Sequence, residues 1–263
     1  MKAVQSISHG QRLCCLMKTN MPQHPLERLD DLVIGGMKLW QRTDQFCFSI
    51  DAVILSHFVP IKSRHVYADL GTGTGVIPLI LTGRGAKQVV GFELNPITAE
   101  LAERNRQLNH KEEEIQIVKA DYCHLPMQEY NGRFDTIVVN PPYFDVKQGK
   151  APLTEARQLA LHESHTTIED VAKAANRLVK FGGSLCMIYR AERLVEALLA
   201  LQKEGLTPKR LRFVHSLPQR EAKLVLIEAR KGGRLGLLTE PPLYIYESTN
   251  AYSEEVRTWY GTT

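Results

Sequence analysis

The sequence predicts an α/β protein whose sheet is mostly parallel and covered by helices on both faces. Apolar segments of strand length alternate with helical segments through most of the 263 residues. Continuous apolar runs of this kind are typical of parallel strands buried on both faces. The last two strand-like segments follow each other with no helical segment between them, which predicts that the sheet ends in an antiparallel pair.

Seven strands and five helices make up the predicted core. We place the strands at 65–70, 88–94, 115–121, 134–139, 184–189, 211–214 and 223–229. We place the helices at 52–58, 76–82, 96–109, 167–180 and 191–204. Pro78 and Pro96 are compatible with first helical turns, where a missing N–H costs nothing. Gly182-Gly183 and Gly205 are expected to end the last two helices.

Outside this core, the sequence predicts two additions to a single domain that spans 26–263. Segments 32–36 and 38–41 form a short hairpin with glycine at its turn, within a hairpin region at 28–45. The catalytic core covers 46–235, and 236–263 is a C-terminal extension. Residues 1–25 are expected to be a flexible tail without function, and Met17 and Met21 are alternative start positions.

Composition predicts an ordinary soluble protein, with 43% hydrophobic and 24% charged residues. No apolar run approaches the roughly 20 residues that cross a bilayer, and the first 25 residues lack the apolar centre of a signal peptide. Five cysteines are an odd number without metal-binding spacing. We therefore expect a cytoplasmic protein, a monomer or weak homodimer, that binds neither membrane nor metal.

Positive charge is concentrated between residues 203 and 234, although the whole chain carries only +4. Three glutamates in this stretch leave a local charge of +6. Two interpretations stay open, a surface that faces phosphate groups or a solvated face of exposed strands. The nine basic residues are Lys203, Lys209, Arg210, Arg212, Arg220, Lys223, Arg230, Lys231 and Arg234.

A glycine-rich turn connects the first core strand to the following helix. Gly71, Gly73 and Gly75 allow the backbone to approach a ligand closely, and Asp69 and Thr72 lie beside them. The turn falls at the carboxyl edge of the sheet, where open α/β folds bind ligands.

Acidic residues at the ends of the next two strands extend this candidate site. Glu93 ends the second strand, where a carboxylate accepts ribose hydroxyls, and Leu94 follows it. Asp121 ends the third strand and is suited to accept from an adenine amino group, with Tyr122 next to it.

The pattern fits two cofactors, a nicotinamide dinucleotide and S-adenosylmethionine. Its spacing is G-x-G-x-G rather than the G-x-G-x-x-G of dinucleotide sites. The carboxylate of Asp69 suits a cationic amino-acid tail, and S-adenosylmethionine carries no pyrophosphate that needs a helix N-terminus. The sequence therefore favours S-adenosylmethionine.

The residues Asn140-Pro141-Pro142-Tyr143 follow the strand at 134–139. Two prolines end the strand and fix the backbone. The amide oxygen of Asn140 and the carbonyl of Pro141 are acceptors beside the Tyr143 ring. This arrangement is suited to holding a planar group that bears an NH2.

Together, these motifs resemble the class I methyltransferases that modify exocyclic or amide nitrogens. The resemblance implies a Rossmann-like, seven-stranded fold in which Asn140 and Pro141 hold the acceptor NH2 and Tyr143 stacks on its plane. Glutamine N5, adenine N6, cytosine N4 and guanine N2 enzymes use versions of this motif. It therefore implies N-methylation without naming the acceptor.

Three further segments narrow the resemblance. They are the lead-in at 46–55, Arg157 with 160–163, and the C-terminal stretches 243–247 and 252–261. Over residues 27–261 the chain is similar to the tRNA1(Val) adenine-N6 methyltransferase family. This implies methylation of adenine 3′ of the anticodon of a tRNA, with Ser49 and Asp51 at the methionine end of the cofactor. Residues 144–166 lack clear periodicity and directly follow the prolines, so we expect an active-site loop there, with Lys147, Lys150 and Arg157 as candidate contacts to the RNA backbone.

Three alternatives stay open. The first is the same chemistry on a guanine or adenine of rRNA or on a protein glutamine. The second is a non-catalytic module that binds S-adenosylmethionine or RNA, and the third is a nicotinamide oxidoreductase. Only 45 residues precede the lead-in, too few for the helical N-terminal domain of the glutamine enzymes. The remaining conspicuous side chains are interpreted as structural contacts or packing anchors. They are His57, His162, His165, Trp40 and Trp259.

Overall fold

A central nine-stranded sheet organises the protein. The computed structural model describes residues 22–32, 34–45, 47–124, 128–141, 166–249 and 251–261. Along the sheet the strands are ordered β10-β8-β9-β7-β6-β3-β4-β5, and β11 also pairs with β8. The two short strands at this end of the sheet are β10 Leu238–Thr239 and β11 Leu243–Tyr244. Its seven long strands are β3 Val66–Leu70, β4 Gln88–Glu93, β5 Ile115–Lys119, β6 Phe134–Val139, β7 Val179–Arg190, β8 Leu206–His215 and β9 Ala222–Lys231.

The predicted mixture of parallel and antiparallel strands is confirmed. Strands β5, β4, β3, β6 and β7 are parallel neighbours. Strand β9 is antiparallel to both β7 and β8. The central strands are covered on both faces, as their continuous apolar sequences predict. Strand β6, for example, is buried along nearly its whole length.

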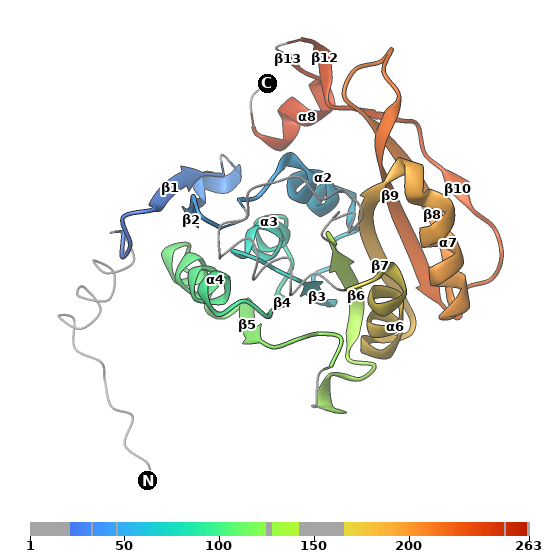
Figure 1. Cartoon of the computed structure of the whole chain (residues 1–263), viewed down its shortest axis with the longest axis horizontal. Helices are drawn as coiled ribbons and strands as arrows, with labels where there is room; N and C mark the ends of the chain where they lie inside the picture. The colour runs from blue at the N-terminus through green and yellow to red at the C-terminus, as the bar shows by residue number, and fades with distance from the viewer. Residues whose placement is uncertain are drawn as a thin grey trace.

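Helices cover both faces of the sheet (Figure 1). On one face lie α2 Ile50–Phe58, α3 Val76–Gly83 and α4 Pro96–Leu108, and on the other lie α6 Ile168–Leu178 and α7 Leu194–Lys203. Two clusters of buried apolar side chains fill these layers, one under α2 and α3 and one under α6 and α7. Within the described part of the chain, none of the helices has the length and apolar character of a membrane span.

Local signals explain where several helices begin. Asn95 precedes α4 and its side chain accepts a hydrogen bond from the backbone N–H of Ile97, while Pro96 occupies the first helical position. Thr167 and Asp170 form a capping box at the start of α6. These caps bear out the predicted helix starts to within one residue.

Some predicted boundaries are wrong. Helix α6 ends at Leu178, and Gly182-Gly183 lie inside β7 instead of closing the helix. The segment 191–204 divides into a 3-10 turn, Ala191–Arg193, and α7. Strands β8 and β9 have ten residues each, because backbone pairing extends past the apolar segments that revealed them.

The N-terminal hairpin exists, but its first strand lies earlier than predicted. It consists of β1 Glu27–Asp31 and β2 Lys38–Arg42, and the turn Ile34–Gly36 lies between them. Opposite charges face each other across the strands, Glu27 with Arg42 and Asp31 with Lys38. The search for apolar strand segments did not detect this first strand, because it is mostly charged and is stabilised by cross-strand pairs.

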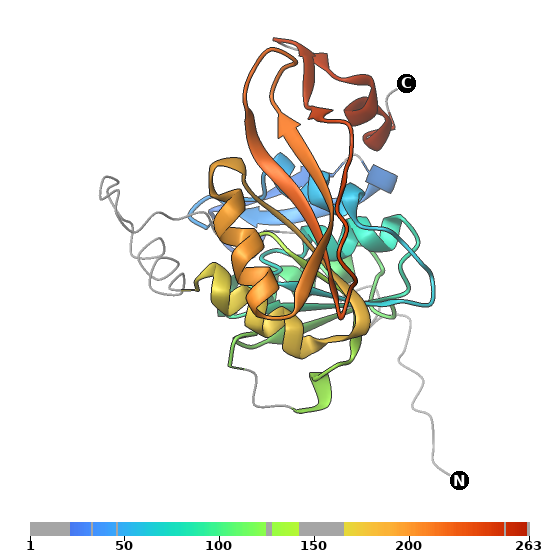
Figure 2. The ribbon, with the colours of Figure 1, turned by 90° about the vertical axis from the view of Figure 1, so that its right-hand side faces the viewer.

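The C-terminal extension contains structure that the sequence did not reveal. It comprises β10 Leu238–Thr239, β11 Leu243–Tyr244, β12 Tyr246–Ser248, β13 Ala251–Tyr252 and α8 Glu254–Trp259. Figure 2 shows it standing with the β8–β9 hairpin above the rest of the molecule. The Trp259 ring stacks on His57 of α2 at 4.7 Å between centroids. Both rings are therefore packing groups, as predicted.

Candidate active site

The register of three parallel strands brings the predicted motifs together. Leu70, the last residue of β3, is paired with Phe92 of β4 and with Val139 of β6. The residues that follow these paired positions therefore lie side by side at the carboxyl edge of the sheet. These residues are Gly71, Glu93 and Asn140.

The glycine turn is held against β4 by its own backbone. The N–H groups of Gly71 and Thr72 both donate to the carbonyl of Phe92, at 2.9 Å. Gly75 has φ of 86° and lies against Ala102 of α4, so that a Cβ built there is 3.4 Å from the Ala102 methyl. This backbone conformation and close packing require glycine at position 75.

Asp69 lies under the turn and is completely buried. Its Oδ2 accepts a hydrogen bond from the Thr72 hydroxyl at 2.6 Å. Its Oδ1 is buried and has no hydrogen-bond partner among the described residues. Burial raises the pKa of Asp69 to about 7, and the nearby charge of Glu93 acts in the same direction.

The carboxylate of Glu93 is fixed by backbone N–H groups on two sides. Gly73 donates to Oε2 at 2.6 Å and Asn95 donates to Oε1 at 2.9 Å. Burial raises the pKa of Glu93, and these hydrogen bonds act in the opposite direction. Each oxygen retains an acceptor position for a ligand hydroxyl. Leu94 beside it is 41% exposed and offers an apolar surface.

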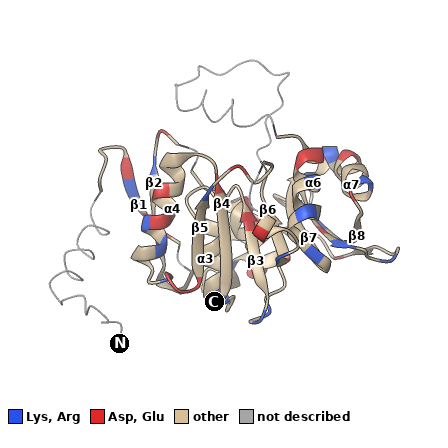
Figure 3. Ribbon diagram, turned by 90° about the horizontal axis from the view of Figure 1, so that it is seen from below, with Lys and Arg blue, Asp and Glu red and all other residues tan. Residues whose placement is uncertain are grey.

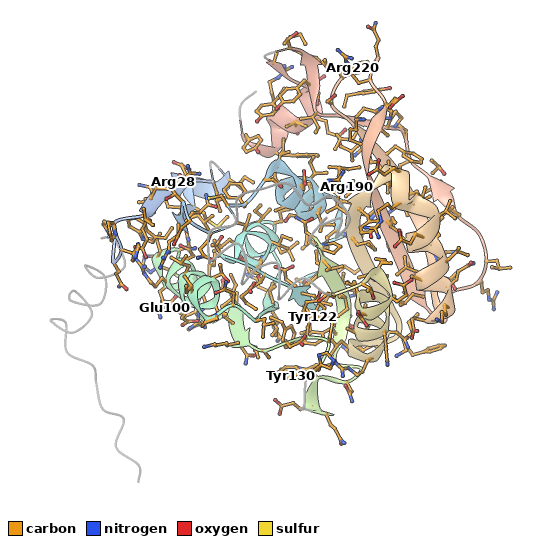
Figure 4. All side chains as sticks on the ribbon, in the orientation of Figure 1. Arg28, Glu100, Tyr122, Tyr130, Arg190 and Arg220 are labelled. Carbon is orange, nitrogen blue, oxygen red and sulfur yellow. The ribbon has the colours of Figure 1, made fainter. Side chains whose placement is uncertain are left out.

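Asp121 lies two residues beyond β5, next to Tyr122. Its Oδ1 accepts from the N–H of Cys123 at 2.8 Å, and its Oδ2 lies 2.7 Å from Nδ1 of His124. Tyr122 is near the glycine turn, since a Cβ built at Gly71 is 3.9 Å from its ring (Figure 4). Burial raises the pKa of the Tyr122 hydroxyl. Both residues therefore belong to the same edge as Glu93.

The lead-in residues Ser49 and Asp51 lie at the start of α2. The Ser49 side chain hydrogen-bonds to the Asp51 carboxyl. Burial raises the pKa of Asp51, and the bond to Ser49 partly offsets this effect. Asn140 is partly buried and Pro141 is buried at the end of β6. Pro142, Tyr143 and the predicted loop up to residue 165 lie outside the described residues, together with Lys147, Lys150, Arg157, His162 and His165.

Sequence reasoning missed Asn105 on α4, although it contacts the glycine turn. Its Nδ2 donates to the carbonyls of Trp40 and Thr74, at 3.0 and 2.9 Å, and its Oδ1 accepts from the N–H of Trp40 at 2.6 Å. Asn105 is completely buried. The sequence did contain a signal, because Asn105 lies on the same apolar helix face as Leu101 and Ala102. An asparagine on a buried face is expected to have hydrogen-bond partners.

The basic stretch 203–234 is not one phosphate-facing surface. Four of its cations are paired with other groups of the same chain. Arg210 binds Glu228 and Glu240, and Arg212 binds Glu255. Lys209 and Lys231 donate to backbone carbonyls. The others divide between two ends of the sheet. Arg220 lies at the tip of the β8–β9 hairpin (Figure 4). Arg230 is the next-to-last residue of β9 and therefore lies near the opposite end of the hairpin. Neither of the two original interpretations describes the whole stretch.

Comparison with known proteins identifies the fold and the family. Residues 49–204, more than half of the chain, match the family described as methyltransferase small domain. The chain belongs to this family.

Relatives of this methyltransferase include two proteins named tRNA1(Val) (adenine(37)-N6)-methyltransferase. That of Porphyromonas gingivalis is 33% identical over 71% of this chain and 74% of its own length. That of Haemophilus influenzae is 30% identical over 78% of this chain and 86% of its own length.

Solved structures show the same fold. A predicted O-methyltransferase of Agrobacterium tumefaciens, Atu636, has a TM-score of 0.63 at 22% identity and covers 81% of this chain and 96% of its own. Trm5 of Methanocaldococcus jannaschii, in complex with adenosine, has a TM-score of 0.55 at 16% identity and covers 81% and 57%. The predicted α/β methyltransferase fold is confirmed, and its seven predicted strands are the long strands of a sheet to which β10 and β11 are added.

The methyl donor of this family is S-adenosylmethionine. The residues present fit it, because a buried carboxylate oxygen of Asp69 has no partner in the described part of the chain and the cofactor bears an ammonium group. The glycine turn offers close backbone approach at the same place. When bound, the cofactor supplies an electrophilic methyl group.

Proposed function

We propose that this methyltransferase transfers a methyl group to the exocyclic N6 of adenine in a tRNA, at the adenine 3′ of the anticodon. The observation that carries the proposal is the pairing of Leu70 with Val139. Because of this pairing, the glycine turn and the Asn140 motif begin at the ends of neighbouring strands. An acceptor nitrogen held by Asn140 is then next to the methyl donor. The names of the relatives supply the class of acceptor.

The cofactor would be held by four groups of residues. Asp69 faces the ammonium, with Ser49 and Asp51 at the methionine end. Glu93 accepts from the ribose hydroxyls, and Leu94 lies against the adenosine. Asp121 and Tyr122 flank the adenine. The turn residues Gly71, Thr72, Gly73 and Gly75 supply the backbone that surrounds the donor.

Asn140 and Pro141 would hold the acceptor through its two N–H groups, the first to the amide oxygen and the second to the carbonyl. This aims the nitrogen lone pair at the methyl carbon, with Pro142 fixing the backbone and Tyr143 stacking on the base. The C–N bond forms as the C–S bond breaks, and the excess proton leaves the nitrogen afterwards. Positioning accounts for most of the rate, and no strong base is required.

An anticodon loop suits this site because its bases unstack at low cost. Enzymes that modify a base take it out of the stack into a pocket. A tRNA substrate also places the enzyme in the cytoplasm. Residues 144–166 follow the acceptor motif directly, so we assign them to the contact with the loop, including Lys147, Lys150 and Arg157.

The test is incubation of the purified protein with S-adenosylmethionine and tRNA from a strain that lacks its gene, followed by nucleoside analysis. We expect N6-methyladenosine to appear in tRNA, in the anticodon loop. Parallel reactions use rRNA and a glutamine-containing protein substrate. Methylation of either of these with none in tRNA would refute the proposed acceptor.

A further inference from the structure

A pocket lies at the edge of the sheet opposite the candidate active site. It has a volume of about 310 Å³ and opens at the amino ends of β3, β6 and β7. In Figure 3 this is the lower edge, where blue Lys and Arg segments lie below β3 and along β7. Its lining includes Lys62, His65, Asp135, Lys180, Phe181 and Arg230.

An irregularity in β7 forms one wall of this pocket. Phe134 pairs with Val179 and Thr136 pairs with Ser184, so residues 180–183 bulge out between these two pairs. A Cβ at Gly183 would come within 2.8 Å of the carbonyl oxygen of Asp135. The glycine is therefore required for the bulge, which presents Phe181 and Gly182 to the pocket.

The two carboxylates of the pocket are neutralised within the protein. Asp135 accepts from both the ammonium of Lys180 and the N–H of Val66, at 2.9 Å. These contacts lower the pKa of Asp135 despite its partial burial. Glu228 is bound by Nε of Arg210 at 2.8 Å. Neither carboxylate is left to repel an anion.

Two exposed cations of the same pocket have no carboxylate partner among the described residues. They are Lys62, before β3, and Arg230, which lies opposite Ser184 in the β7–β9 pair. The ring nitrogen Nδ1 of His65 is also buried without a hydrogen-bond partner in that part of the chain. The pocket therefore has an excess of positive charge and of unused polar groups.

An aromatic side chain stands at the rim. Phe181 is 83% exposed, and its ring covers the backbone of Gly232, where an added Cβ would be 2.3 Å from the ring. This contact fixes the ring beside the cations instead of burying it. Positive charge next to an exposed aromatic ring is the combination that binds nucleotides, since the ring stacks on a base.

We propose that this pocket binds a phosphate-bearing nucleotide. Lys62 and Arg230 hold the phosphate and Phe181 stacks on the base. The ligand is either a free mononucleotide or a nucleotide within a single RNA strand, because both present the same phosphate and base. Since the pocket lies across the sheet from Asn140, its ligand is separate from the adenine that is methylated.

The experiment measures binding of adenosine monophosphate and of a short fluorescent oligoribonucleotide to the full chain. S-adenosylhomocysteine is present at saturation, so that the active-site edge is occupied. We expect binding of at least one probe, weakened about tenfold by Arg230→Gln and reduced by Phe181→Ala. Lys223→Gln, which removes an exposed cation at the far end of the β8–β9 hairpin, is the matched control and should bind normally.

The two probes distinguish the sources of the ligand. Binding of the monophosphate identifies a free nucleotide, and binding of the oligonucleotide alone identifies an RNA strand. Thermal unfolding of each variant verifies that the fold is intact. The proposal is overturned if neither probe binds under these conditions, or if Arg230→Gln binds as tightly as Lys223→Gln.

Discussion

The side-chain amide of Asn105 donates a hydrogen bond to the carbonyl oxygen of Thr74, at 2.9 Å. Through the same amide, Asn105 also bonds both backbone groups of Trp40. One buried side chain thus connects the N-terminal hairpin, α4 and the glycine turn. The hairpin supports the glycine turn, and its attachment is reinforced by the nearly buried ion pair of Arg104 with Glu27.

Replacing Asn105 by Ala should weaken cofactor binding more than it slows methyl transfer. The change removes the hydrogen bonds of Asn105 to the Thr74 carbonyl and to the Trp40 backbone, at a cost of about 1–3 kcal/mol each, and releases the turn. We expect a cofactor KM raised about tenfold with kcat changed much less. Steady-state kinetics at varied S-adenosylmethionine measures both.

Asn109 provides the control for Asn105. It makes a similar pair of bonds to the Lys38 backbone, at 2.9 and 2.7 Å, and within the described residues its side chain makes no hydrogen bond to the glycine turn. Asn109→Ala should lower the melting temperature while leaving the cofactor KM near that of the wild type. If both variants raise KM equally, loosening of the hairpin and not the bond to Thr74 is responsible.

Asp69 should make cofactor binding and stability depend on pH in opposite ways. In the folded protein the pKa of Asp69 is raised from 3.8 to about 7, so the protonated carboxyl stabilises the fold. This contribution to the free energy of unfolding is complete below pH 3.8 and is lost as the pH rises to about 7. The cationic cofactor needs the ionised form, so its affinity should increase over the same window. Titrations at about pH 6 and pH 8 measure the affinity.

Asp69→Asn separates the two effects. Without the ionisable group, the cofactor-free protein should lose less stability than the wild type between about pH 5 and pH 8. Its affinity for S-adenosylmethionine should be low at both ends of that range. Urea unfolding and calorimetry provide the measurements. A wild-type affinity that is constant with pH would contradict this role for Asp69.

Asn140→Ala should abolish methyl transfer without removing cofactor binding. The variant loses one of the two acceptors proposed for the substrate NH2, while the contacts of Asp69 and Glu93 are untouched. We expect kcat to fall about 100-fold or more, with the cofactor Kd changed by less than about threefold. Isothermal titration beside a tritium-transfer assay tests this. Full activity of this variant on RNA would contradict the proposed role of Asn140 in holding the substrate NH2.

Arg210 should matter for stability and not for RNA. Its guanidinium binds Glu228, Glu240 and the carbonyl of Phe58 in a partly buried position. Arg210→Met leaves the glutamates unpaired and should cost about 3 kcal/mol in the free energy of unfolding. Lys223→Met, at an exposed site, should change it by less than about 0.5 kcal/mol. Equal effects in urea unfolding would contradict the structural role.

Much of the fold could be predicted because its signals are local. Apolar runs located the seven core strands, and Pro96 located the start of the helix that follows the second strand. The hairpin strand at Glu27–Asp31 and the C-terminal elements escaped detection, since cross-strand charges and contacts distant in sequence stabilise them. Gly182-Gly183 was misassigned because a glycine pair ends a helix as readily as it permits a strand to bulge.

By itself, the sequence determined the chemistry of the motifs, since Asp69, the three glycines and Asn140-Pro141 are defined by residue type and spacing. It also determined the alternation of strands and helices that supports them. The tertiary structure decided which motifs meet, because pairing of Leu70 with Phe92 and Val139 is a register between distant segments. It also divided the basic stretch, since Arg210 and Arg212 find their partners only after the C-terminal extension folds against β8.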